Sequence, residues 1–155
     1  MFTRTLVLTA VVAALLPAPG RLDAQAAPTA AGVGQQYSIM IWETPAQLAL
    51  RTDSAKGGAY WSAFAQYGAE LQKAGILRGG SALRTGDAVR TVTVRKGATR
   101  VRTASEARAG TDLGGYFIIE VASLDDAVRW AARIPSALTG AVEVRPAYPA
   151  PTMMK

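Results

Sequence analysis

Two repeat lengths in the hydrophobic pattern divide most of the chain into strands and helices. Five short segments are rich in β-forming residues and bounded by turn-forming residues; they are residues 37–43, 90–95, 99–103, 115–121 and 141–145. The helical period occurs in four aromatic or aliphatic residues spaced by four, three and four: Tyr60, Phe64, Tyr67 and Leu71. They predict a helix over residues 56–74, with Gly75 as its stop.

The order of these elements predicts a ferredoxin-like α+β fold. Residues 123–126, Ser-Leu-Asp-Asp, are typical of a helix N-terminus, and Pro135 ends that second helix. Residues 90–95 and 99–103 alternate around Lys96-Gly97 and are interpreted as a hairpin with one face in water. Strand, helix, hairpin, strand, helix and strand therefore follow one another, which is βαββαβ with one extra strand.

Two of the strands, residues 37–43 and 116–121, are apolar on both faces, as is expected of central strands. Two helices can cover only one face of such a sheet, so the other face needs a second layer. We therefore expect a homodimer whose sheets face each other, with a ligand cavity between the sheet and its loops.

The N-terminus is typical of a secretory signal peptide. A basic residue, Arg4, precedes an apolar run over residues 6–16, and Ala24-Gln25-Ala26 offers a cleavage site after Ala26. The run is about half of what a helix needs to cross a hydrocarbon core of roughly 30 Å. We expect residues 1–26 to be removed and the protein to be periplasmic or secreted, without a membrane anchor after cleavage. A small, polar lead-in (27–36), one domain (37–146) and a Pro-rich tail (147–155) would remain.

Composition narrows the chemistry. The chain has no cysteine and no histidine, which excludes disulfides, thiol nucleophiles, His-ligated zinc and the Ser-His-Asp triad. We expect neither a metal nor a cofactor. The 17 Lys and Arg exceed the 11 Asp and Glu, and five of these basic residues gather on the hairpin: Arg90, Arg95, Lys96, Arg100 and Arg102. We interpret them as a solvated edge protected by charge, and not as a nucleic-acid site, because no aromatic side chain interleaves with them.

Three stretches together carry a family resemblance: residues 67–83, with Tyr-Gly-Ala-Glu-Leu and later Gly-Gly-Ser-Ala-Leu; residues 113–121, Leu-Gly-Gly-Tyr-Phe-Ile-Ile-Glu-Val; and residues 130–146, from Trp-Ala-Ala-Arg-Ile-Pro to Val-Glu-Val-Arg-Pro. Over residues 37–146 the chain resembles the YCII-related family in its DGPF-domain branch. The resemblance implies a ferredoxin-like fold of the dimeric α+β barrel superfamily.

The namesake motif of that branch is absent. Aligned without gaps from Leu113-Gly114-Gly115, Asp-Gly-Pro-Phe falls on residues 103–106, Thr-Ala-Ser-Glu, and the Glu that usually follows falls on Arg108. A His/Asp pair inferred as the site of some relatives has no matching residues here. The position of the missing motif and the polar residues of this loop give six candidate ligand contacts: Thr103, Ser105, Glu106, Arg108, Asp112 and Tyr116.

Three functions stay open. The leading interpretation is an exported, homodimeric domain that binds a small anionic or aromatic molecule without metal. A lyase-like or isomerase-like enzyme would use Glu106 or Asp112 as a base and Tyr116 as a hydroxyl donor. A structural or interaction domain would have no pocket, and a cavity large enough for a drug-sized ligand would count against it.

Overall fold

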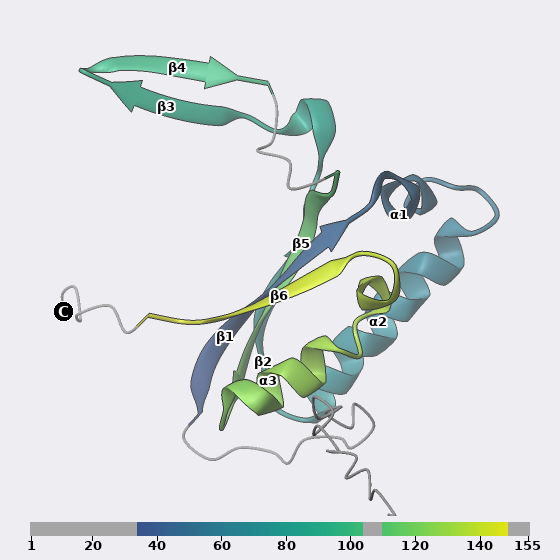
Figure 1. Cartoon of the computed structure of the whole chain (residues 1–155). Coiled ribbons are helices and arrows are strands. Elements are labelled where there is room, and N and C mark those ends of the chain that lie inside the picture. The colour runs from purple at the N-terminus through teal and green to yellow at the C-terminus, as the bar shows by residue number, and fades with distance from the viewer. Residues whose placement is uncertain (1–33, 104–109, 149–155) are drawn as a thin grey trace, which may run out of the picture.

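The computed structural model describes residues 34–103 and 110–148 and shows a four-stranded antiparallel sheet with helices on one side (Figure 1). The strands lie in the order β2 (Leu77–Ala82), β5 (Asp112–Val121), β1 (Gln35–Glu43) and β6 (Ala141–Pro146). Helix α2 (Gly57–Lys73) follows β1, and helix α3 (Leu124–Ala131) follows β5. Two β-α-β units interleaved in this order form a ferredoxin-like sheet, so the predicted fold class is confirmed.

Local sequence explains where the helices begin and end. Helix α2 ends at Lys73, and Gly75 follows with a φ of 71°, a left-handed conformation that glycine adopts without strain. Ser123 caps α3 by accepting a hydrogen bond from the backbone N–H of Asp126. A short helix, α1 (Pro45–Leu50), was not predicted; it begins with a capping box in which Thr44 and Gln47 bond each other's backbone N–H groups.

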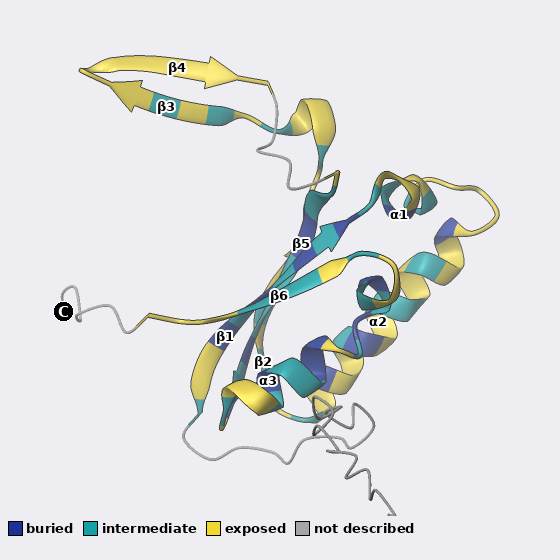
Figure 2. Ribbon diagram, in the orientation of Figure 1, coloured by how far each residue is buried: buried dark blue, intermediate teal, exposed yellow. Residues whose placement is uncertain are grey.

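The core lies between the sheet and the helices. Its strand residues alternate along β1 and β5, where Tyr37, Ile39, Ile41, Ile119 and Val121 are all buried (Figure 2). The helices and the turns beside them complete the core with Tyr67, Leu71, Ile76, Ala127, Trp130, Ala131 and Ile134. Because side chains of a strand alternate between its faces, this packing uses every second residue of the central strands.

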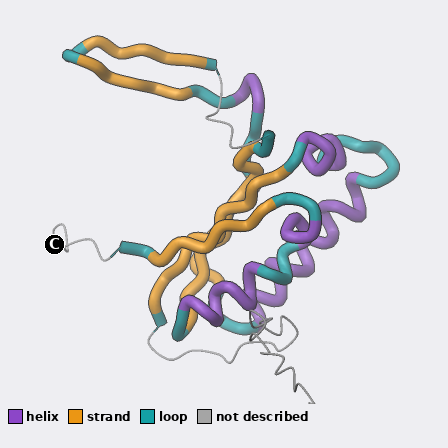
Figure 3. The backbone as a smooth tube through the Cα atoms, in the orientation of Figure 1, coloured by secondary structure: helices purple, strands orange, loops and turns teal. Residues whose placement is uncertain are grey.

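The edge strand β2 was not predicted, and the predicted hairpin does not belong to the main sheet. Leu77–Ala82 reads Leu-Arg-Gly-Gly-Ser-Ala, with two glycines and no apolar alternation, so the strand pattern is absent although the segment pairs with β5. The hairpin, β3 (Thr91–Arg95) and β4 (Ala98–Arg102), forms a separate two-stranded sheet that projects from the body of the fold (Figure 3). It is an insertion between β2 and β5, which also contains a 3₁₀ turn (Gly86–Ala88). A second 3₁₀ turn (Pro135–Leu138) precedes β6.

None of the described helices lies over the second face of the main sheet (Figure 1). The register places Met40 opposite Tyr116, and Ser38 opposite Ile118. These residues are half-buried, whereas Ile39, which lies between Ser38 and Met40, is completely buried. Residues 1–26, for which a signal peptide is predicted, lie outside the described residues. Within the described part of the chain, no helix is both long and apolar enough to span a membrane.

Candidate functional site

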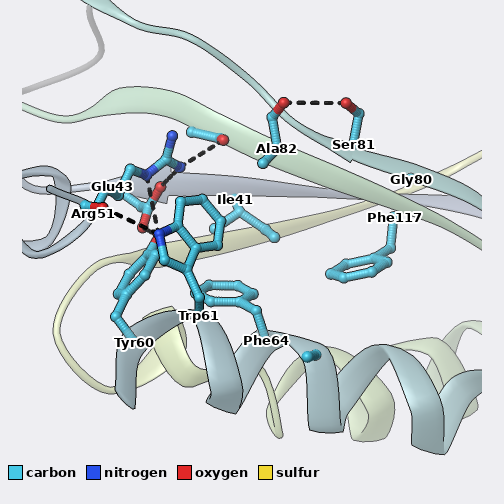
Figure 4. A pocket seen from close by; sticks show the side chains of 13 residues that line it. Ile41, Glu43, Arg51, Tyr60, Trp61, Phe64, Gly80, Ser81, Ala82 and Phe117 are labelled. Atoms are coloured by element: carbon cyan, nitrogen blue, oxygen red, sulfur yellow. Dashed lines mark hydrogen bonds and ion pairs between the residues drawn. The ribbon is translucent and has the colours of Figure 1, made fainter. Parts of the chain in front are cut away.

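A cavity of about 470 Å³ lies between α2 and the helix-side face of the sheet, towards the start of α2 (Figure 4). Three strands and one helix contribute its walls. Its side-chain lining is mainly aromatic or aliphatic, with Ile41, Tyr60, Trp61, Phe64, Ala65 and Phe117, and its floor includes backbone of β2 and of Gly114 and Gly115. The volume falls within the range of about 300–1,000 Å³ that is usual for small-molecule sites.

One end of the cavity is closed by a polar cluster around Glu43. This residue is the last of β1 and is completely buried. Its carboxylate forms an ion pair with Arg51 and accepts a hydrogen bond from the Tyr60 hydroxyl. Ser136 donates a longer bond of 3.4 Å to the same carboxylate. A buried charge needs partners of this kind, because an unpaired carboxylate would be strongly destabilising away from water.

Arg51 connects this cluster to the neighbouring backbone. Its Nη1 donates to the carbonyl of Leu83 at 2.7 Å, its Nη2 to the carbonyl of Gly114 at 2.6 Å, and its Nε to the Tyr60 hydroxyl at 3.2 Å. The position after α1 therefore supplies a guanidinium that joins the loop after β2 to β5 and to α2. Its donors are directed at protein acceptors, and its charge is balanced by Glu43.

Gly114 makes room for the cluster. A Cβ built at this position would lie 1.7 Å from Oε2 of Glu43 and 2.4 Å from Nη2 of Arg51. Only glycine lets β5 pass this close to the ion pair. The pairing of β5 with β1 also shifts here, from Ile41 opposite Gly115 to Trp42 opposite Leu113, so that Gly114 is the extra residue of a β-bulge.

The Tyr60 hydroxyl is held in its protonated form. Burial, and after it the hydrogen bond to the Glu43 carboxylate, raises the pKa of Tyr60 from 10.0 to about 12. Near neutral pH, Tyr60 is therefore a donor and not a base. A ligand that enters this end of the cavity meets a neutral phenol and a charge-balanced ion pair.

An aromatic wall from α2 faces the sheet across the cavity (Figure 4). Tyr60 makes an edge-to-face contact with Trp61 and a tilted contact with Phe64, each with ring centroids 5.0 Å apart. Trp61 donates its indole N–H to the Arg51 carbonyl at 3.1 Å, and the Arg51 guanidinium carbon lies 5.7 Å from the Trp61 ring centre. Trp61 remains 41% exposed, so it stands at the mouth of the cavity rather than in the core.

The family model of the YCII-related domain matches residues 35–150. The chain belongs to the YCII-related family. The match begins at the first residue of β1 and includes every strand and helix described above. No curated protein matches the chain.

Of the contacts predicted for this YCII domain, those that the structure describes do not line the cavity. Thr103 is exposed just after β4, and Ser105, Glu106 and Arg108 lie outside the described residues. Asp112 and Tyr116 both belong to β5, but neither lines the cavity. The bulge also separates them: Asp112 pairs with Glu43 of the helix-side face, whereas Tyr116 pairs with Met40 of the uncovered face.

The residues of the cavity were missed by the sequence analysis, although Glu43 left a signal. Residues 37, 39, 41 and 43 share one face of β1, and the first three are apolar and buried. A carboxylate in the fourth place of such a series predicts a buried charge with a partner. A tryptophan within the predicted helix would ordinarily be assigned to the core, but Trp61 is 41% exposed and lies on the part of α2 that borders the cavity.

Proposed function

We propose that this YCII domain binds a small, mainly apolar aromatic molecule in the cavity beside α2. The observation that carries the proposal is the lining: three aromatic side chains of α2 and Phe117 of β5 surround a space of about 470 Å³, with a polar cluster at one end. Flat rings stack or meet edge to face with such walls, and a few fixed polar groups then orient the ligand.

The contacts favour a neutral ligand over an anionic one. Among the described residues that line the cavity, Arg51 is the only one with a cationic side chain. Its guanidinium is already paired with Glu43 and bonded to two backbone carbonyls. An entering anion would have to lose its hydration and would meet no uncompensated positive charge. A neutral ring with a hydroxyl or carbonyl group fits the Tyr60 end without that loss.

The other two functions have less support. Catalysis by Asp112 with Tyr116 needs both side chains at one substrate, and the register assigns them to opposite faces of the sheet. The other candidate base, Glu106, lies outside the described residues. A domain without a pocket is disfavoured by the cavity itself. We infer binding rather than chemistry because the groups at the polar end are held by one another.

We also propose that the domain works as a homodimer and is exported. The uncovered sheet face, with half-buried Met40, Trp42, Tyr116 and Ile118, supports a second copy as its cover. Export rests on the sequence of residues 1–26. Mass measurement of the mature protein from an exporting host tests this part: a chain that retains Met1 would contradict it.

Calorimetric titration with 2-naphthol and with its anionic counterpart 2-naphthoate tests the ligand class. We expect saturable binding of 2-naphthol and weaker binding of 2-naphthoate. Ala65→Phe fills the cavity and should weaken 2-naphthol binding at least about tenfold, while Ala69→Phe, on the same helix but outside the cavity lining, should leave it unchanged. Equal binding by the two variants would remove the cavity as the site. Tighter binding of the naphthoate would reverse the proposed charge preference.

A further inference from the structure

We call the hairpin of β3 and β4, residues 91–102, the arm. Within the described part of a single chain, few contacts with the rest of the fold stabilise it. Its two strands pair only with each other, and they extend from the end of the main sheet as a two-stranded ribbon. Such ribbons are at best marginally stable in water without a further layer. The ribbon projects on the side of the sheet opposite α2 and α3, which is the side that the uncovered face is turned to (Figure 1).

The arm has one apolar face and one basic face. In its ladder Val92 pairs with Val101, and Val94 pairs with Thr99, which places the three valines on the same side. Thr93 pairs with Arg100, and Arg95 pairs with Ala98, on the other side. Val92, Val94 and Val101 are 58%, 55% and 59% exposed. The sequence predicts one solvent-exposed face for this hairpin, and in the single chain both faces are largely exposed.

We propose that the valine face of the arm packs against a second copy of the chain that is docked on the uncovered sheet face. The proposal rests on the homodimer proposed above and adds a second contact to it. The dimensions agree: five residues of strand reach about 17 Å, whereas two packed sheets lie about 10 Å apart. An arm that leaves one sheet on its open side therefore extends past the level of the partner's sheet.

Two arms, one from each copy, would add apolar surface to that of the sheet face, because Val92, Val94 and Val101 are all more than half exposed in the single chain.

The distribution of charge is compatible with a second copy as the partner. The valines and the arginines occupy opposite faces of the arm, so that burial of the valines turns Arg95 and Arg100 towards water. There the charges keep the exposed ribbon from pairing with other edges.

Sedimentation of the mature, full-length chain over a range of concentrations tests the proposal. Exchange of all three valines for threonine, V92T/V94T/V101T, keeps β-branched side chains and should raise the dimer dissociation constant at least about tenfold. The matched variant R95Q/R100Q changes the opposite face and should leave the constant unchanged. A valine variant as dimeric as the wild type would overturn the inference.

Further measurements separate failure of the arm contact from failure of the dimer. Met40→Lys disrupts the sheet face: loss of dimer in this variant, with none in the valine variant, would retain the sheet interface and reject the arm. A wild type that is monomeric at every concentration would reject both. Amide exchange in the wild type gives an answer without any variant. Protection of residues 91–102 should increase with dimer population, and protection that is independent of concentration would reject the arm contact. Loss of binding to anionic vesicles by the valine variant, with an unchanged dimer, would assign the arm to a membrane instead.

Discussion

The two faces of the four-stranded sheet are built from the same strands and differ in almost everything else. On the helix side, Ile39 and Ile119 are completely buried, and the strand ends at the polar cluster of Glu43. On the other side, Met40 and Ile118 alternate with them in sequence and are only half-buried. Position within a strand, more than residue type, decides whether an apolar side chain contributes to the stability of one chain or remains available to a partner.

The largest effect is expected at Gly114, where the helix-side face meets the cluster. Gly114→Ala puts a methyl group where the Glu43 carboxylate and the Arg51 guanidinium lie. Separation of a buried ion pair costs about 3–5 kcal/mol, so we expect the free energy of unfolding to fall by an amount of that order. Urea unfolding followed by circular dichroism measures it. Gly68→Ala is the control, since a Cβ there meets no atom within 4 Å, and alanine should stabilise α2 by about 0.5–1 kcal/mol. Similar losses in the two variants would contradict the packing at Gly114.

A smaller loss of stability is expected from a pair of substitutions that compares the two faces directly. Ile39→Ala removes a completely buried side chain and should lower the free energy of unfolding by about 2–5 kcal/mol. Met40→Ala, on the next residue of the same strand, should cost roughly 1 kcal/mol or less when measured at concentrations that keep the chain monomeric. If the two losses were equal under those conditions, the difference between the faces would not exist in the single chain.

The subtlest test is the response of the polar cluster to alkali. Because the pKa of Tyr60 is raised from 10.0 to about 12, the folded state keeps the phenol proton that the unfolded chain loses. The stabilisation is complete below pH 10.0 and is lost as the pH rises to about 12. Burial also raises the pKa of Tyr67, so the decline should persist in part after Tyr60→Phe. Unfolding free energies of wild type and Tyr60→Phe over this range measure the share of Tyr60; identical slopes would show that its proton is not linked to folding.

Periodic burial made much of the fold predictable. The spacing of Tyr67 and Leu71 identified α2, and the apolar character of both faces of β1 and β5 identified the central strands. Strand β2 was not predictable in the same way. Gly79 and Gly80 have no side chains to show a period, and the strand is formed by its hydrogen bonds to β5.

The candidate site depended on contacts that sequence spacing does not reveal. Glu43, Arg51 and Tyr60 are brought together by a strand end, the turn after α1 and the first turn of α2. None of them belongs to the motifs that carry the family resemblance. The predicted contacts came from the loop before β5, where the family's motif would lie, and that choice followed the family's pattern rather than the packing of this chain.

The long connection between β2 and β5, which includes the arm, determines how well the fold tolerates insertions and deletions. Twenty-nine residues separate Ala82 of β2 from Asp112 of β5, although the two strands are neighbours in the sheet. The entropy of closing a loop grows only with the logarithm of its length, so this connection costs about 2 kcal/mol more than a turn of about four residues. Insertions and deletions in the arm are therefore nearly neutral for the sheet and the cavity. A variant with a longer, shorter or differently charged arm should therefore keep the same interior.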